Sequence, residues 1–248
     1  MKPVQLLLCL ACLLPAQLAL AQDAPPAEAA QEIRRDESNP DFYLELIAGM
    51  QQKRLFYASL AHLDVFEQRW PGDRRALLLR ADALRSTGDF ERARQHYRRL
   101  LDKGALPGAW HGLGLIAAAE GDLPAAATAL GQAVALAPID VRILNDLGYL
   151  QLLLGERDAA RLSLHKAAEL APENRQAGAN LALWYLLAGH AGRAEQIMGR
   201  HGFTEAQRLT VRADAQRIGQ GGAATGNAFG NGGEGMEERT GEQMEMVK

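Results

Sequence analysis

Cysteine is scarce in this sequence, because only Cys9 and Cys12 occur among the 248 residues. Both lie in a mostly apolar run near the N-terminus, which follows a basic second residue and ends in Ala19-Leu20-Ala21. A short basic start, an apolar centre and small residues at −3 and −1 are typical of a secretory signal peptide, here residues 1–21. Cleavage after Ala21 would remove both cysteines. The remaining chain would then hold no disulfide, thiolate nucleophile or cysteine metal site.

A second processing route remains open at Cys12. The sequence Leu10-Ala11-Cys12 partly matches the bacterial lipoprotein box, in which the cysteine is lipidated. The Ala-Leu-Ala site downstream is the better match, so we expect a plain signal peptide, with lipidation at Cys12 as the alternative. Either route predicts an exported, periplasmic protein. Membrane attachment, at the outer membrane, is expected only if Cys12 is lipidated.

Long apolar runs and an excess of basic charge are also missing. No segment after residue 21 approaches the roughly 18–20 apolar residues that a membrane-spanning helix needs. The formal net charge is −3, and no basic stripe of the kind that binds a phosphate backbone occurs. The sequence therefore does not predict nucleic acid as a partner.

Motifs for catalysis or cofactor binding are absent as well. The six histidines form no i, i+4 pair and no HExxH motif, and no Ser/His/Asp arrangement can be assembled from spacing. Gly112-x-Gly114-x-x-Ala117 matches part of a dinucleotide fingerprint, but Pro107 and Trp110 place it inside a helix rather than after a strand. We expect a protein without cofactor or metal and without enzymatic activity. A hydrolase with an unrecognised site is a remote alternative.

What the sequence does contain is a repeat. Four glycines, each after an apolar helical segment, are spaced by 33, 34 and 34 residues: Gly88, Gly121, Gly155 and Gly189. The same spacing recurs in two further series, Ala93, Ala126, Ala160 and Ala194, and the small residues Ala81, Gly114, Gly148 and Ala182. Three series with one period indicate an array of repeated helix pairs, because such periods are typical of helical repeat proteins.

The positional pattern resembles the tetratricopeptide repeat, a pair of antiparallel helices over about 34 residues. The matching residues of one unit are Trp110, Leu113, Gly114, Gly121, Ala126 and Pro138, and those of the next are Leu144, Leu147, Gly148, Gly155, Ala160 and Pro172. The resemblance implies an all-α fold, a TPR-type α-solenoid of antiparallel helix pairs with a C-terminal capping helix. Stacked pairs of this kind bury a continuous core and form a concave groove.

The expected organisation follows from these patterns. After the signal peptide come a flexible linker (22–39), a divergent N-terminal helix pair (40–70) and the repeats (71–203, as about 74–106, 107–140, 141–174 and 175–203). Thr204-x-x-Gln207 is a capping box that opens a capping helix at 204–218, and a Gly-rich tail at 219–248 is expected to be disordered. Asp73, Asp140 and Asn174 should cap first helices. Gly148 should let the paired helix, through Ala160, come close to the backbone.

The informative surface is the predicted groove. First-helix concave positions begin at Leu78, Asp82 and Arg85, and apolar groups accumulate toward the C-terminal repeats. The residues predicted to bind a protein partner are His111, Leu115, Arg142, Asn145, Tyr149, Leu152, Asn180, Leu183 and Leu186. Such a surface suits a partner helix or extended segment with an apolar face. The alternative is that about half of these residues are core residues under the next repeat or the capping helix.

Residues 145–198 carry a second resemblance. This stretch, from NDLGYLQLLLG to GRAEQIM, is similar to the C-terminal repeats of the TadD family of Flp (Tad) pilus assembly proteins. The resemblance implies a non-enzymatic, pilotin-like scaffold in the bacterial envelope that helps a secretin or other Tad pilus components assemble. That family is usually lipidated, which bears on Cys12. Repeat factors of type IV pilus biogenesis or cytochrome c biogenesis are alternatives.

Overall fold

The computed structural model describes residues 39–221. The predicted signal peptide, Cys12, nearly all of the linker and the tail beyond Gly221 lie outside these residues. The chain divides into two units, residues 1–43 and 44–248. Of the first unit only residues 39–43 are described, and they begin helix α2.

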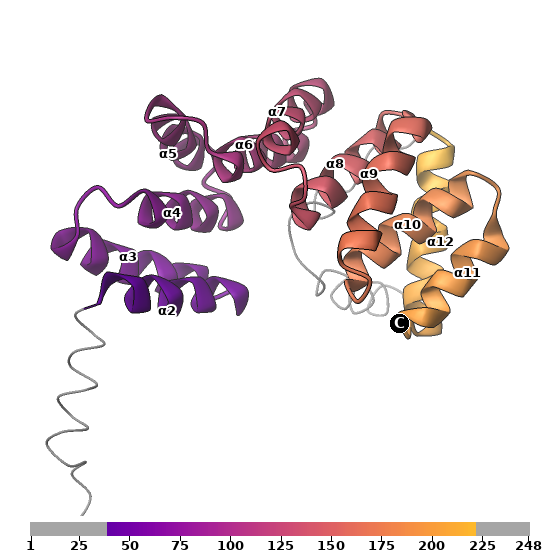
Figure 1. The fold of residues 1–248 in the computed structure, drawn as a ribbon, viewed down its shortest axis with the longest axis horizontal. Coiled ribbons are helices and arrows are strands. Elements are labelled where there is room, and N and C mark those ends of the chain that lie inside the picture. The colour runs from indigo at the N-terminus through magenta and orange to yellow at the C-terminus, as the bar shows by residue number, and fades with distance from the viewer. Residues whose placement is uncertain (1–38, 222–248) are drawn as a thin grey trace, which may run out of the picture. The chain divides into compact units, whose positions relative to one another are not determined.

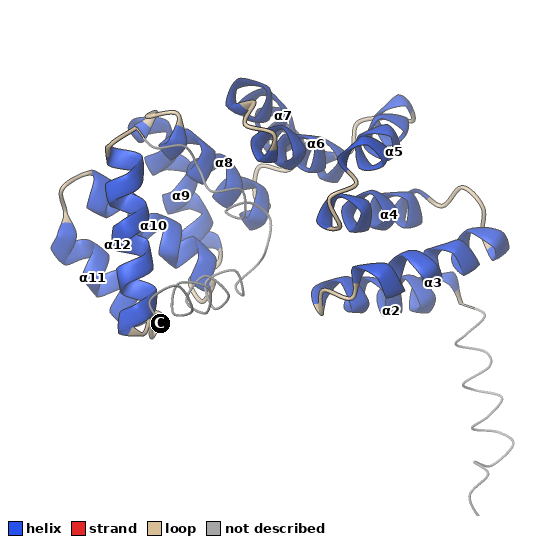
Figure 2. Ribbon diagram, turned by 180° about the vertical axis from the view of Figure 1, so that it is seen from behind, coloured by secondary structure: helices blue, strands red, loops and turns tan. Residues whose placement is uncertain are grey.

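Every regular element of the described residues is a helix (Figures 1 and 2). Helices follow one another in short pairs, and each pair packs against the next. This arrangement confirms the predicted all-α fold of paired helices. The helices are α2 (Pro40–Gln52), α3 (Phe56–Arg69), α4 (Arg74–Ser86), α5 (Phe90–Asp102), α6 (Pro107–Ala119), α7 (Leu123–Leu136), α8 (Val141–Leu153), α9 (Arg157–Leu170), α10 (Arg175–Leu187), α11 (Ala191–Arg200) and α12 (Glu205–Gly219).

The helix ends form where the sequence predicts them. Asp73 accepts a hydrogen bond from Arg75 N at 2.7 Å, Asp140 from Arg142 N at 3.0 Å and Asn174 from Ala177 N at 3.0 Å, so each caps the helix that follows. The four periodic glycines all have positive φ, between 77° and 85°, which ends the first helix of each pair. Thr204 and Gln207 form the expected capping box at the start of α12.

Small residues inside the first helices allow close packing within each pair. A Cβ placed on Gly148 would lie 2.5 Å from Leu164 Cδ2, and one on Gly114 would lie 2.9 Å from Leu130 Cδ2. The close approach expected at Gly148 is therefore confirmed, but the residue that makes it is Leu164, not Ala160. Ala160 is buried one turn earlier on α9, and the atoms nearest to Gly148 all belong to Leu164.

The glycine string in α6 also has a packing role. Gly112 and Gly114 both lie inside α6, as predicted, so they do not form the loop that a dinucleotide fingerprint requires. The ring of Tyr97, from the preceding pair, fills the space that a Cβ on Gly112 would need. Both glycines thus mark places where a neighbouring helix comes close.

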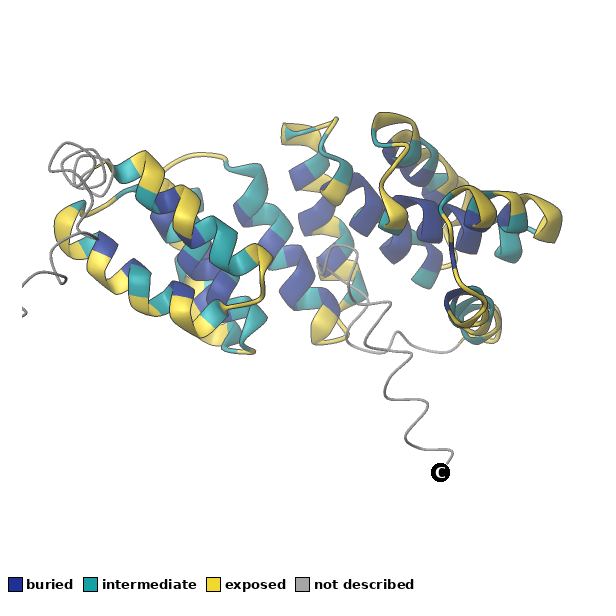
Figure 3. Ribbon diagram, turned by 90° about the horizontal axis from the view of Figure 1, so that it is seen from below, coloured by how far each residue is buried: buried dark blue, intermediate teal, exposed yellow. Residues whose placement is uncertain are grey.

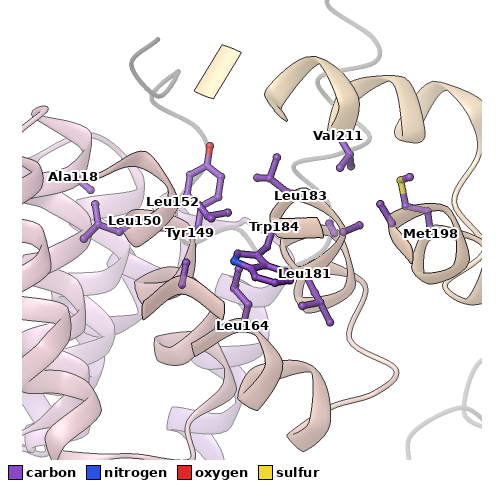
Figure 4. Close-up of a cluster of buried hydrophobic side chains, with 14 of the residues drawn as sticks. Ala118, Tyr149, Leu150, Leu152, Leu164, Leu181, Leu183, Trp184, Met198 and Val211 are labelled. Atoms are coloured by element: carbon purple, nitrogen blue, oxygen red, sulfur yellow. The ribbon is translucent and has the colours of Figure 1, made fainter. Parts of the chain in front are cut away.

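Buried side chains line the inward faces of the helices in two main clusters (Figure 3). One joins α4, α5 and α6 around Tyr97, Leu100 and Ile116. The other runs from α6 to α12 and includes Leu164, Trp184 and Met198 (Figure 4). None of the described helices is both long and apolar enough to cross a bilayer.

Candidate interaction groove

A pocket of about 530 Å³ opens on one side of the first helices. Its walls come from α2, α4, α6 and α8, from the start of α10 and, through Phe56, from the start of α3, so each successive pair contributes its first helix. Mixed polar and apolar side chains line it, among them Gln52, Leu78, Asp82, Arg85, His111, Leu115, Arg142, Asn145, Asp146 and Gln176. We call this space the open pocket.

Asp82 is the carboxyl group held in the wall of the open pocket. Its Oδ1 accepts a hydrogen bond of 2.6 Å from the hydroxyl of Tyr97, a fully buried residue. Burial raises the pKa of the Asp82 carboxyl above its usual value, and the nearby positive groups of Arg85, His111 and Arg142 only partly oppose this. Burial also raises the pKa of Tyr97 well above the usual value, so Tyr97 remains a hydrogen-bond donor at neutral pH.

Two side-chain contacts tie neighbouring first helices together along the pocket. His111 Nε2 of α6 lies 2.7 Å from Asp146 Oδ2 of α8, and both side chains are almost buried. Asn180 Nδ2 of α10 donates to Asn145 Oδ1 of α8 at 3.0 Å. Arg142, in contrast, has a side chain that is 77% exposed at the rim. The wall is therefore preorganised, and the positive charge of Arg142, paired with Asp140 at 3.2 Å, lies at its edge.

The structure places the predicted groove residues in the pocket lining, behind it or in an apolar cluster, and Leu115, 3% exposed, belongs to both the lining and the cluster. His111, Leu115, Arg142 and Asn145 line the open pocket. Asn180 is buried behind it and bonds to Asn145. The remaining four, Tyr149, Leu152, Leu183 and Leu186, belong to the apolar cluster that also contains Val211 of α12.

These last four residues require a correction. Tyr149, Leu152 and Leu183 (Figure 4) are 4%, 2% and 3% exposed. Leu186 is partly buried and packs against the same cluster. Helix α12 packs on α10, and its Arg217 interacts with the hydroxyl of Tyr149 on α8. They are therefore core residues under the capping helix, which is the alternative interpretation, because an apolar face of this size is not left in water when a helix can cover it.

The predicted partner-binding set did not include several residues of the open pocket. The repeat period placed Asp82 and Arg85 at concave positions, 33 residues before Leu115 and Ala118, but they were not carried into that set. Asp146 follows Asn145 directly and pairs with His111 of the preceding repeat, a contact that spacing does not reveal. Gln52 comes from the divergent first pair, which the period does not reach.

The described residues contain no cluster of three or more histidine, cysteine, aspartate or glutamate side chains that could hold a metal ion. The chemistry that the pocket offers is recognition by hydrogen bonds, charge and apolar contact. Amide, carboxyl, imidazole and guanidinium groups all occur within it, beside the apolar side chains of Leu78 and Leu115.

Comparison with known proteins agrees with this architecture. Residues 54–109 and 111–175 match the tetratricopeptide repeat family. The TPR repeat-containing protein PA4299 of Pseudomonas aeruginosa is 33% identical over 175 residues, which cover 71% of this chain and 69% of that protein.

Solved structures show the same fold at lower identity. TTC0263, a thermophilic TPR protein of Thermus thermophilus, has a TM-score of 0.59 and 21% identity, with 73% of this chain and 98% of that chain covered. PilF of Pseudomonas aeruginosa has a TM-score of 0.60 and 16% identity, with 86% and 93% covered. With the periodic glycines, the paired helices and the identity to PA4299 all in agreement, the chain belongs to the tetratricopeptide-repeat family.

Proposed function

We propose that this chain is a non-catalytic interaction module whose open pocket holds an extended segment of a partner protein. The observation that carries the proposal is the pocket itself, about 530 Å³, with walls from successive helix pairs and no helix of the described chain filling it. Proteins of this repeat family are in general scaffolds for protein–protein interaction, which agrees with this use. The pocket has the size range of sites that bind a few residues or a small ligand.

The polar groups of the pocket suit a peptide backbone. Each peptide unit offers one N–H donor and one C=O acceptor, and a carboxamide can pair with both. Gln52, Asn145 and Gln176 supply carboxamides from three different helices. The oxygen of Asn145 already accepts from Asn180, so its N–H groups are the ones that can donate to a ligand. Leu78 and Leu115 add apolar contact, and Arg142 adds a positive charge at the rim.

The finer proposal concerns the cellular setting. The N-terminal apolar run and its Ala-Leu-Ala site support export to the periplasm, and the similarity of residues 145–198 to the TadD family supports a role with a secretin or other Tad pilus components. Repeat factors of type IV pilus or cytochrome c biogenesis remain the second candidates. The likeness to PilF, at 16% identity, is one of fold and does not choose among them.

Affinity purification from cell envelopes of the source bacterium tests both levels of the proposal. The unaltered protein is compared with Arg142→Glu and with Arg85→Glu/Arg142→Glu, which reverse positive charge in the pocket. Arg98→Glu, on an exposed position of α5 outside the pocket, is the matched control. We expect the pocket variants to lose the partner and the control to keep it, with helicity by circular dichroism unchanged.

The identity of the recovered protein then decides the pathway. A secretin or another Tad component supports the Tad proposal, whereas a cytochrome maturation factor overturns it. Equal recovery by all variants would show that the open pocket is not the binding site.

A separate measurement tests export and attachment. The intact mass of the protein from envelopes should correspond to a chain that starts at Gln22. A mass that fits an acylated chain starting at Cys12 would instead establish lipidation, and the full-length mass would contradict both routes.

A further inference from the structure

Helix α12 covers a part of the first-helix face that continues directly from the open pocket. Asn145, which lines the pocket, and Tyr149, which lies under α12, are one turn apart on α8. At the start of α10, Gln176 lines the pocket while its neighbour Arg175 donates to Gln207 of α12 at 2.8 Å. A partner segment that runs along the pocket toward the C-terminal repeats would therefore meet α12.

Helix α12 packs differently from the earlier helices of this array. Elsewhere in the array, the first helix of a pair packs on the preceding pair mainly through that pair's second helix, as α8 does on α7 and α10 on α9. Helix α12 packs mainly on α10, a first helix, and reaches α8 through Arg217 and Tyr149. It therefore lies on the same face that forms the walls of the open pocket.

The apolar contribution of α12 is small compared with that of the surface beneath it. In the surface beneath it, Tyr149, Leu152 and Leu183 are 4%, 2% and 3% exposed, whereas the residues that α12 itself buries are Gln207 and Val211. Ala215 and Ile218 add partial contact to the cluster. Burial of apolar area is the main favourable term in helix docking, so this helix is a weak occupant of a strongly apolar surface.

Ion pairs also connect α12 to α11. Glu195 of α11 receives Arg208 at 3.1 Å and Arg212 at 2.6 Å, and these side chains are 27–37% exposed. Pairs with this exposure contribute little to stability. They do define a charge pattern, because an acidic residue faces two arginines one turn apart on the docked helix.

From these observations we propose that the surface under α12, formed by Tyr149, Leu152, Leu183 and Leu186, is a second interaction surface. Its partner is an amphipathic helix with larger apolar side chains than α12 and with basic residues one turn apart for Glu195. That helix takes the place of α12 and continues the site of the open pocket. The inference deepens the proposed function and rests on it for the partner, but the surface is tested on its own.

The tether gives α12 an advantage that the partner must overcome. A helix joined by a short linker competes at an effective concentration on the order of millimolar. A separate helix displaces it only if it binds the surface better than α12 does. Leucine in place of Val211 and Ala215 would enlarge two of the apolar side chains of α12 that contact the cluster.

The first experiment adds synthetic peptides to the unaltered full chain and follows amide hydrogen exchange. The probe has the sequence of residues 203–220 with Val211→Leu and Ala215→Leu, and the control peptide carries Val211→Asp. We expect the probe, at saturation, to speed exchange in residues 205–219 of the protein at least tenfold, with α4 to α7 unchanged. The control peptide should change nothing.

The second experiment loosens α12 within the full chain. Val211→Asp removes the buried apolar contact of α12. Leu209→Asp is the matched control, because Leu209 of the same helix is 56% exposed. The Val211→Asp protein should bind the labelled peptide of residues 203–220 at least tenfold more tightly than the unaltered and Leu209→Asp proteins. If Val211→Asp fails to fold, the exchange experiment alone decides.

No release of α12 by the probe peptide at millimolar concentration would overturn the inference. So would equal peptide binding by folded Val211→Asp and Leu209→Asp proteins. Neither result touches the open pocket, because that site is tested by Arg142→Glu and recovery of the partner. Conversely, Arg142→Glu should leave release of α12 by the peptide unchanged.

Discussion

Asp82 and Leu183 occupy the same repeat position in two regions of the molecule, and their surroundings are opposite. The positions Asp82, Leu115, Tyr149 and Leu183 follow one another by 33, 34 and 34 residues. Asp82 lies in the wall of the open pocket, whereas Leu183 is buried under α12. The same holds for Arg85, which lines the pocket, and Leu186, which packs against the covered cluster.

The residues that pack the helices together are alike in the two regions, whereas the residues of the groove face differ. The small residues, caps and glycines repeat in both regions because every pair has to pack in the same way. The concave positions do not repeat their chemistry, because what faces them differs. A polar set remains open to solvent and ligand, and an apolar set is covered by the chain itself.

The largest effect on stability should come from placing an aspartate, the residue of the open pocket at this repeat position, in the surface that α12 covers. Leu183→Asp puts a carboxylate into the apolar cluster without a partner, and we expect it to lower the free energy of unfolding by about 3 kcal/mol in urea denaturation. Detachment of α12 would limit the loss and would appear as faster exchange in residues 205–219. Leu170→Asp, at a 45% exposed leucine of α9, should stay within about 0.5 kcal/mol. A small effect at Leu183 would contradict the covered state.

The next effect tests whether the scaffold is the same in both regions. Gly114→Leu and Gly148→Leu should each cost about 1–3 kcal/mol, because Leu130 and Leu164 occupy the space that the new side chain needs. Gly131→Ala is the control, since nothing lies within 4 Å of its added Cβ, and it should stabilise α7 by up to about 1 kcal/mol. Thermal unfolding of the three variants measures this. A neutral Gly148→Leu would show that the close packing is not there.

Much of the scaffold could be predicted from the sequence, for a physical reason. Helix ends depend on local chemistry, so Asp73, Asp140 and Asn174 could be assigned as caps and Gly88 as a helix end without knowledge of the fold. Close packing within each pair requires a small residue at the same position of every repeat, and this spacing identified Gly114 and Gly148. The contact partner of Gly148 was misassigned, because a period identifies a helix face but not which turn of it makes the contact.

The site was harder to predict than the scaffold. Apolar concave residues such as Leu183 are equally consistent with a binding groove and with a surface that another segment covers. The difference depends on where α12 docks, and its mostly polar sequence does not show that it packs on α10 rather than on α11. The His111 and Asp146 pair joins residues of adjacent repeats, so no local pattern indicates it.

A smaller effect compares helix caps at the two ends of the array. Asp73→Ala at the start of α4 and Asn174→Ala at the start of α10 should each cost about 1 kcal/mol at pH 7, measured by urea denaturation. The Arg75 side chain lowers the pKa of Asp73 below its usual 3.8 by hydrogen bonding to the carboxylate. The contribution of ionised Asp73 is therefore present above pH 3.8 and is lost as the pH falls through the folded pKa. Asn174 does not titrate, so a loss that changes with acid in the same way at both sites would contradict this assignment.

The smallest effect is a change of slope with pH at Asp82. Burial raises the pKa of this carboxyl, so its contribution is fully present below pH 3.8 and is lost as the pH rises through the folded pKa. Asp82→Asn keeps an oxygen that can accept from Tyr97 but removes the charge, and its stability relative to the unaltered protein should rise with pH over that window and then level off. The slope is opposite in sign to that at Asp73, because one carboxyl is buried beside the open pocket and the other caps an exposed helix end. Parallel stability curves for the two proteins between about pH 3.5 and 8 would show that the Asp82 carboxyl is as well solvated as an exposed one, and the wall of the open pocket would then be wetter than the structure shows.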